Sequence, residues 1–159
     1  MNKLSHQSAK HFRDIFFGGN WTTRNLRDVL DDVTWKEAIM PIHPFNTIVT
    51  LTHHFTYYVP VLMDVLEGKP LTGNDKLSFS HPKIESETDW KKLQTTVWSN
   101  VEKAADLIEQ LSDEQLNSVF TDEKFGTYFR NIHGIIEHTH YHLGQIVVLK
   151  QLIRKQSIT

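Results

Sequence analysis

Two histidines in the C-terminal part of the chain have the spacing of ligands to one metal ion. His138 and His142 stand four residues apart in the segment that begins at Glu137. Each residue of an α-helix advances by about 100°, so these two imidazoles are roughly 40° and one turn apart. Neighbours of this kind on one helix face can bind the same divalent cation. His140 is turned about 200° from His138 and cannot share that ion.

A third ligand is expected from another helix, because two protein side chains rarely hold a metal ion alone. His54 is the best candidate, since it lies on the apolar stripe of a second helical segment. That stripe consists of Ile48, Leu51, Tyr58 and Val61. His53 is turned about 100° off the stripe, so we prefer His54 over His53 as the first ligand. The interior of a helix bundle is where such a site is built.

The other histidines are expected to lie outside the ligand set. His11 lies on an apolar-leaning face and would be a fourth polar group in the cavity, although a hydrogen-bonded helical histidine is the favoured interpretation. Four more are expected at the surface or in loops, namely His6, His43, His81 and His133. Glu137 points about 100° away from His138, so it is expected to face solvent rather than act as a base.

Two known metal motifs do not fit this chain. The zinc-protease pattern His-Glu-x-x-His needs glutamate at position 139, where the chain has Thr139. A di-iron bundle needs paired Glu-x-x-His motifs, and Glu137-x-x-His140 supplies one. A three-histidine site with open positions remains, and its neutral imidazoles would leave a divalent ion able to polarise water or a thiol. The alternative is that His138 and His142 bind no metal and are hydrogen-bonded polar residues at a helix–helix interface.

Composition limits both the fold and the chemistry. The 159 residues suit a single domain, 1–159, with one core. Lys and Arg number 17 and Asp and Glu number 19, and this balance argues against a nucleic-acid partner bound on a basic face. The sequence has no cysteine, which excludes disulfides, thiolate catalysis and Cys-type zinc sites. Any reacting thiol must therefore come from outside the chain.

Four long helical stretches are expected to position the histidines, in an all-α fold. They cover residues 4–17 with a continuation from Thr22 or Thr23 to Asp31, residues 45–67, residues 90–111 and residues 128–155. In each, apolar residues recur at steps of three and four, the period of a helix. Pro60 is expected to kink the second stretch. Lys150, Arg154 and Lys155 are expected to form a solvated basic end of the fourth.

Short polar motifs mark where helices should begin. Thr34 and Glu37 have the spacing of a capping box before a short helix, and Ser112 precedes another. Ser86, Thr88 and Asp89 are cap candidates for the third long stretch.

The connection from Lys69 to Thr88 has no sustained period and is expected to lack regular structure. A helix of about 22 residues is roughly 33 Å long, and about 20 extended residues reach further than that. The connection therefore predicts a crossover between the second and third helices of a four-helix bundle.

The N-terminus has no apolar segment of the secretory type, so a cytoplasmic protein is expected. The apolar-leaning stretch from Thr47 to Leu66 contains histidines, a proline and an aspartate. It is too polar to cross a bilayer, and no membrane partner is expected.

These motifs together resemble the DinB-like superfamily, which includes bacillithiol transferases. The resemblance rests on Thr47-Ile48-Val49 leading to His54 and Tyr57-Tyr58, on Gly18-Gly19-Asn20-Trp21, and on His138-x-x-x-His142-Leu143-Gly144-Gln145-Ile146. It covers nearly the whole chain. It implies a four-helix bundle in up-down-down-up order, with a divalent ion, commonly zinc or nickel, held by three histidines. Position by position these are His54, His138 and His142.

In characterised relatives the metal activates a low-molecular-weight thiol for transfer to an electrophile, and homodimers are frequent. The leading hypothesis is therefore a metal-dependent thiol S-transferase that acts on a small-molecule substrate. Tyr58, one turn beyond His54, would orient the cofactor or ligand, and the alternative for Tyr58 is an aromatic core residue.

Three other functions stay open. The same site with bound water would give a hydrolase. A bundle that only binds metal or a small ligand would be a non-catalytic stress or detoxification module. Two axial histidines could instead hold haem. An open coordination position that faces a pocket would favour an enzyme, because structural sites are closed by four ligands.

Overall fold

The computed structural model describes residues 3–156, and helices are the regular elements in that range. In chain order they are α1 (Leu4–Phe17), α2 (Leu26–Asp31), α3 (Trp35–Ile39), α4 (Ile48–Thr56), α5 (Tyr58–Leu66), α6 (Asp75–Ser78), α7 (Glu87–Glu109), α8 (Asp113–Asn117), the 3₁₀ turn η1 (Glu123–Phe125) and α9 (Tyr128–Gln156). The predicted all-α class is confirmed.

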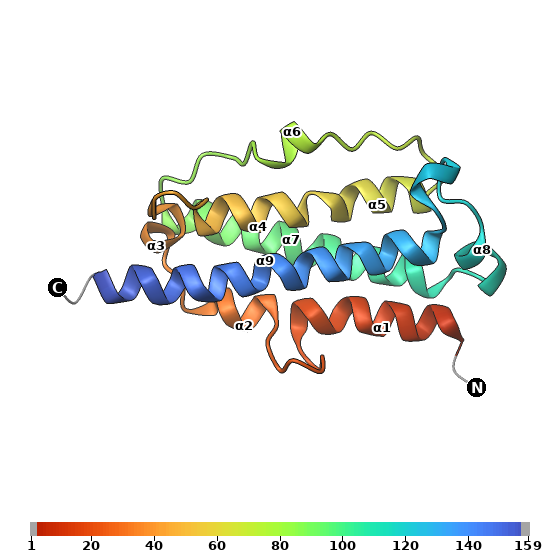
Figure 1. Cartoon of the computed structure of the whole chain (residues 1–159), viewed down its shortest axis with the longest axis horizontal. Coiled ribbons are helices and arrows are strands. Elements are labelled where there is room, and N and C mark those ends of the chain that lie inside the picture. Colours follow the sequence, from red (N-terminus) through yellow and green to blue (C-terminus); the bar gives the residue numbers. More distant parts are fainter. Residues whose placement is uncertain (1–2, 157–159) are drawn as a thin grey trace.

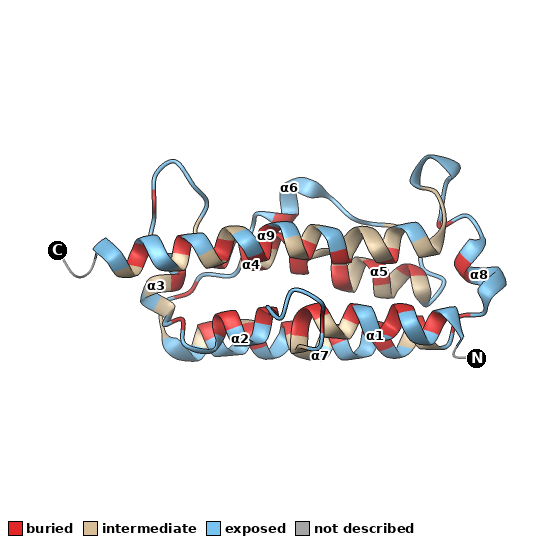
Figure 2. Cartoon of the chain, turned by 60° about the horizontal axis from the view of Figure 1, so that its bottom comes forward, coloured by how far each residue is buried: buried red, intermediate tan, exposed pale blue. Residues whose placement is uncertain are grey.

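The longer helices lie side by side along the long axis of the molecule (Figure 1). α2 follows α1 along the same row after the loop of residues 18–25, α4 continues into α5, and α7 and α9 each run as one long helix. α1 packs against α7 and α9, α4 packs against α9, and α5 packs against α7. Buried residues are concentrated where these rows face one another (Figure 2). They form one cluster whose largest fully buried side chains include Trp90, Phe12, Phe16 and Phe55.

Local capping explains where several helices begin. The Ser86 side chain accepts a hydrogen bond from the Asp89 backbone at the start of α7. Thr34 and Glu37 form a full capping box at α3, and Ser112 forms one with Gln115 at α8. Each cap satisfies a backbone N–H that has no partner inside its helix. These starts agree with the predictions from the sequence.

The stretch predicted as one helix over residues 45–67 is two helices that meet at Tyr57. Pro60 has no N–H to donate to the Thr56 carbonyl, so the ladder of backbone hydrogen bonds is interrupted there. Pro60 itself lies in the first turn of α5, where a missing N–H costs little. The helical path begins at Ile48 rather than residue 45, because the Thr47 side chain caps it.

Two further predictions were wrong, one about where a helix begins and one about the connection after α5. α2 begins at Leu26 rather than at Thr22 or Thr23, since Asn25 is the residue that caps it. The connection after α5 is not without structure, because it contains α6. Asn74 caps this short helix by accepting from the Lys76 backbone. The connection runs along the α4–α5 row, with α6 near its middle (Figure 1).

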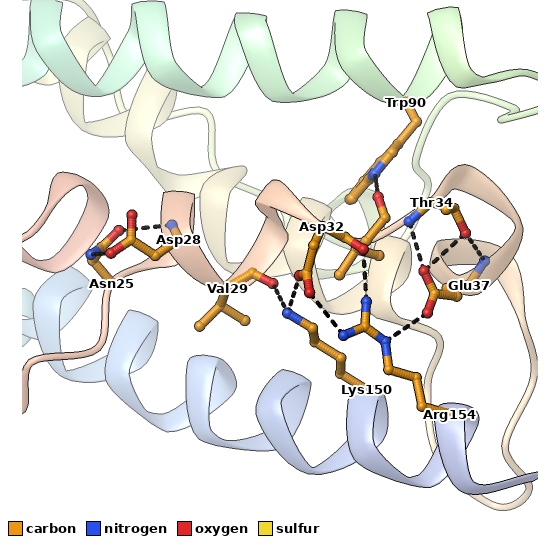
Figure 3. A network of polar contacts seen from close by, with 10 residues as sticks. Asn25, Asp28, Val29, Asp32, Thr34, Glu37, Trp90, Lys150 and Arg154 are labelled. Carbon is orange, nitrogen blue, oxygen red and sulfur yellow. Dashed lines mark hydrogen bonds and ion pairs between the residues drawn. The ribbon is translucent and has the colours of Figure 1, made fainter.

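The basic end of α9 is not simply solvated, which corrects the prediction. Arg154 donates to Asp32 at 2.8 Å and to Glu37 at 2.9 Å. Lys150 donates to the Val29 carbonyl and pairs with Asp32. Figure 3 shows these side chains joining α9 to α2 and α3. The cations therefore tie the last helix to the N-terminal half of the chain.

None of the helices in residues 3–156 has both the length and the apolar character needed to span a membrane.

Candidate metal centre

Three imidazoles meet between α4 and α9. His54 comes from α4, and His138 and His142 come from successive turns of α9. One ring nitrogen from each lies within 4.8 Å of the others. The His54 ring centroid is 4.9 Å from both α9 rings, and the two α9 rings are 4.6 Å apart. The structure thus brings together the three histidines that sequence analysis selected.

The packing of α4 on α9 explains why this cluster is sheltered. His54 and His142 lie on the facing sides of their helices and are only 7% and 8% exposed. His138, at the edge of the stripe, is half-buried. Thr139, next to it, turns into the core and donates its hydroxyl to the Ile135 carbonyl. The cluster therefore has two sheltered members and one that reaches toward the surface.

A hydrogen-bonded chain through α6 orients His54. Its Nδ1 lies 2.6 Å from Ser78 Oγ, and that hydroxyl donates to the Asp75 carbonyl at 2.6 Å. Because the single hydroxyl proton is already used, Ser78 Oγ must accept from His54 Nδ1–H. The lone pair of His54 is then on Nε2. Outer partners of this kind commonly fix the tautomer of a metal-binding histidine.

Gln145 has the same role for His142. The carbonyl oxygen of the Gln145 side chain lies 2.7 Å from His142 Nδ1, so this nitrogen donates and leaves Nε2 free. His142 Nε2 lies 2.9 Å from His138 Nε2. Two nitrogens bound tetrahedrally to zinc lie about 3.3 Å apart; the His138–His142 pair is close to that at 2.9 Å, and all three ring nitrogens lie within 4.8 Å of one another. The donor set therefore fits a divalent ion.

Burial keeps these histidines in the form that binds metals. Burial, together with the charges that His142 and His54 would carry, lowers the pKa of His138 to about 4. Burial also lowers the pKa of His54 and that of His142. A neutral imidazole offers a lone pair, whereas a protonated one does not. At neutral pH the cluster thus presents three nitrogen donors.

Aromatic side chains cover the cluster. The Phe79 ring, directly after α6, is stacked on His54 with centroids 4.1 Å apart. Phe55 is parallel to His142 at 6.0 Å. Tyr58 lies 5.5 Å from His138, and its hydroxyl donates to the Asp75 carboxylate at 2.8 Å. Tyr58 is therefore beside the site rather than deep in the core, with its hydroxyl held by α6.

The remaining histidines lie apart from the cluster. His53 faces away toward His81, with ring centroids 6.3 Å apart, which agrees with the preference for His54. His11 is exposed and its ring is 5.7 Å from His133, so it is not a fourth polar group in the cavity. His133 is half-buried against Phe129, not a simple surface residue.

Glu137 is exposed, and so are His6 and His43, as predicted. His81 lies in the connection after α6 but is partly buried, next to His53.

Four neighbours of the cluster were not recognised from the sequence as partners of the histidines. Ser78, Phe79 and Asp75 belong to the connection that appeared to lack structure, and no local pattern linked them to His54. Gln145 did carry a signal, because residues three apart on a helix are neighbours and it follows His142 by three.

A comparison with known protein families identifies a group to which the chain is similar. Residues 20–146 match the model of the DinB superfamily, a range that includes all three clustered histidines. No curated protein matches the chain significantly, and no solved structure does either. Because the match spans well over half of the sequence, the chain belongs to the DinB superfamily.

Proposed function

We propose that this protein is a metal-dependent enzyme that joins a low-molecular-weight thiol to an electrophilic small molecule. It binds one divalent ion, zinc or nickel, through His54, His138 and His142. The observation that carries the proposal is the convergence of three imidazole nitrogens beside a cavity, two of them oriented by a hydrogen-bond partner. That cavity has a volume of about 630 Å³ and His142 is part of its wall.

A divalent ion held by neutral imidazoles supplies Lewis acidity, which lowers the pKa of a thiol next to it. Ser78 and Gln145 keep their histidines in the tautomers that this requires. The thiolate forms a carbon–sulfur bond while the leaving group departs with its electron pair, and the thiol proton passes to solvent. Because the chain contains no cysteine, the thiol is a second substrate or cofactor.

An open side of the site favours an enzyme over a non-catalytic binding module. A structural metal site is closed by four protein ligands, and a catalytic one keeps a position for a substrate or water. Within residues 3–156 the ligand group contains three residues. The cavity at His142 gives a small molecule access to it. A hydrolase that activates water would use the same geometry and is the second candidate.

The proposal includes the wider organisation that the superfamily implies. Residues 1–159 form one domain, a four-helix bundle in up-down-down-up order that works as a cytoplasmic homodimer. The path of the long rows in Figure 1, with a connection between α5 and α7 along the molecule, supports this order. The balanced charge supports a small-molecule substrate rather than nucleic acid.

Thiol conjugation tests the proposal directly. The zinc-loaded and nickel-loaded proteins are mixed with 1-chloro-2,4-dinitrobenzene and cysteamine, and the thioether product is followed by absorbance. We expect turnover above the uncatalysed rate that is lost in His138→Ala and kept in His140→Ala, a matched control on the same helix. Hydrolysis of 4-nitrophenyl acetate without any thiol conjugation would contradict the transferase and support the hydrolase.

A further inference from the structure

α6 and Phe79 lie next to the three histidines, and the two ends of this segment line different cavities. Phe79, at the C-terminal end, lines the cavity of about 630 Å³ that also contains His142. Asp75, at the N-terminal end, lines a second cavity of about 330 Å³ together with Tyr58. We call the first the apolar cavity and the second the Asp75 cavity.

The apolar cavity has no charged wall. Besides Phe79, half of the residues that line it have apolar side chains, namely Pro44, Phe45, Leu51, Val148, Leu149 and Leu152. None of the described residues that line it carries a carboxylate, an ammonium or a guanidinium group. A charged ligand would lose its hydration there without gaining a partner. A neutral apolar ligand has no strong hydration to lose. The volume is within the usual range for small-molecule sites.

Two features indicate that the apolar cavity is open for a ligand. Phe45 is 59% exposed and Val148 is 55% exposed, so large apolar side chains face an unfilled space. Gly144 on α9 lines the same space, and a Cβ atom added to it would meet no atom within 4 Å. His142, a member of the cluster, lines the same space.

The Asp75 cavity differs from the apolar cavity because a charged side chain lines it. Asp75 provides the charged group among the described residues that line it, and its carboxylate accepts from the Tyr58 hydroxyl. The Asp75 carbonyl accepts from Ser78 Oγ, which in turn accepts from His54. The carboxylate is therefore attached to the same short helix that orients His54. An ammonium group would be attracted to it.

We propose that α6 divides the approach to the three histidines between two reactants. A neutral apolar electrophile occupies the apolar cavity, and a thiol that carries an amine occupies the Asp75 cavity. This inference rests on the proposed transferase function. The thiolate of the aminothiol forms the carbon–sulfur bond, the leaving group departs with its electron pair, and the thiol proton passes to solvent.

Two glycines of α9 provide a matched test of the apolar cavity. Gly144 lines the cavity and Gly134 does not, and at both positions an added Cβ meets nothing within 4 Å. Leucine favours a helix more than glycine does, so both leucine variants are expected to fold. The probe is 1,3-dinitrobenzene, a neutral aromatic that has no leaving group, and its affinity is measured by ligand-observed NMR without thiol.

We expect Gly144→Leu to weaken binding of this probe by about tenfold, because the side chain fills the space, and Gly134→Leu to leave it within about twofold. Equal affinities in the two variants would overturn the assignment of the apolar cavity. A cavity covered by a second copy of the chain, detected as a dimer that excludes the probe and dissociates in Gly144→Leu, would overturn it too.

A charge series of thiols tests the Asp75 cavity. Cysteamine, 2-mercaptoethanol and 3-mercaptopropionate carry an ammonium, no charge and a carboxylate, and their binding to the zinc-loaded protein is measured by NMR line broadening. We expect affinity to fall in that order, and the order to disappear in Asp75→Asn but not in Asp113→Asn, a control on α8. An unchanged order in Asp75→Asn would overturn this half of the inference.

These binding measurements distinguish the assignment of the apolar cavity from the proposed transferase function. Selective loss of the probe in Gly144→Leu supports the cavity assignment even where no conjugation is observed, and absent conjugation then contradicts the transferase alone. Turnover of 1-chloro-2,4-dinitrobenzene that is equal in Gly144→Leu and Gly134→Leu overturns the cavity assignment and leaves the transferase intact.

Discussion

The smallest unit of the site is a histidine together with the side chain that fixes its tautomer. His54 relies on Ser78, and His142 relies on Gln145. The two supports differ in origin, because Gln145 is on the same helix as its histidine and Ser78 comes from a distant part of the chain. Loss of such a partner leaves the ligand in place but no longer oriented.

Ser78→Ala is expected to weaken zinc affinity by about 10–100-fold, because His54 loses the acceptor for its Nδ1–H. Competition with a chromogenic chelator measures this affinity. Ser80→Ala is the control, since Ser80 is exposed and two residues further along the same connection. Equal affinities in the two variants would show that Ser78 does not position His54.

The three clustered histidines could be chosen from the sequence because each obeys a local rule. The four-residue spacing of His138 and His142 places them on one helix face, and His54 follows the apolar period of its own helix. The role of Asp75, Ser78 and Phe79 could not be predicted, because it depends on how the connection packs against α4. That packing is tertiary and leaves no period in the sequence.

At the scale of elements, helices with strong local signals were predicted well. α7 and α9 combine a sustained apolar period with clear starts and stops, and their observed bounds lie close to the predicted ones. The break at Tyr57 was predicted only as a kink at Pro60. α6 was missed because four residues are too few to show a helical period.

The contact of α9 with α2 and α3 gives a prediction about pH. Hydrogen bonds from Arg154 and Lys150 lower the pKa of Asp32 to about 2. A folded-state pKa below the unfolded value of about 3.9 means that the ionised form stabilises the fold. This stabilisation is complete above about pH 4 and is lost as the pH falls toward about 2.

Asp32→Asn should therefore lower the free energy of unfolding by about 1 kcal/mol at neutral pH, a modest value because the carboxylate is largely exposed. The difference between wild type and Asp32→Asn should shrink as the pH falls from about 4 to about 2. Urea unfolding at several pH values measures it. A difference that is the same at pH 7 and at low pH would contradict a role for the ionised carboxylate.

At the scale of the whole molecule, the site lies at the interface between two helices that are far apart in the sequence. α4 and α9 pack together, and the connection that carries α6 adds a third segment on the same side of His54. An ion held there would link α4 to α9, and Ser78 would connect α6 to it through His54. The long connection after α5 runs back along the α4–α5 row (Figure 1), and this path brings Ser78 of α6 to His54.

The central claim is that these three histidines bind one divalent ion, and metal content by mass spectrometry tests it most directly. Untagged wild-type protein is reconstituted with zinc or nickel, dialysed and compared with His54→Ala and with His53→Ala. The neighbour His53 is the matched control, because its ring faces away from the cluster. We predict close to one ion per chain in wild type and His53→Ala, and none in His54→Ala. Wild type without stoichiometric metal, or equal metal in the two variants, would contradict the account.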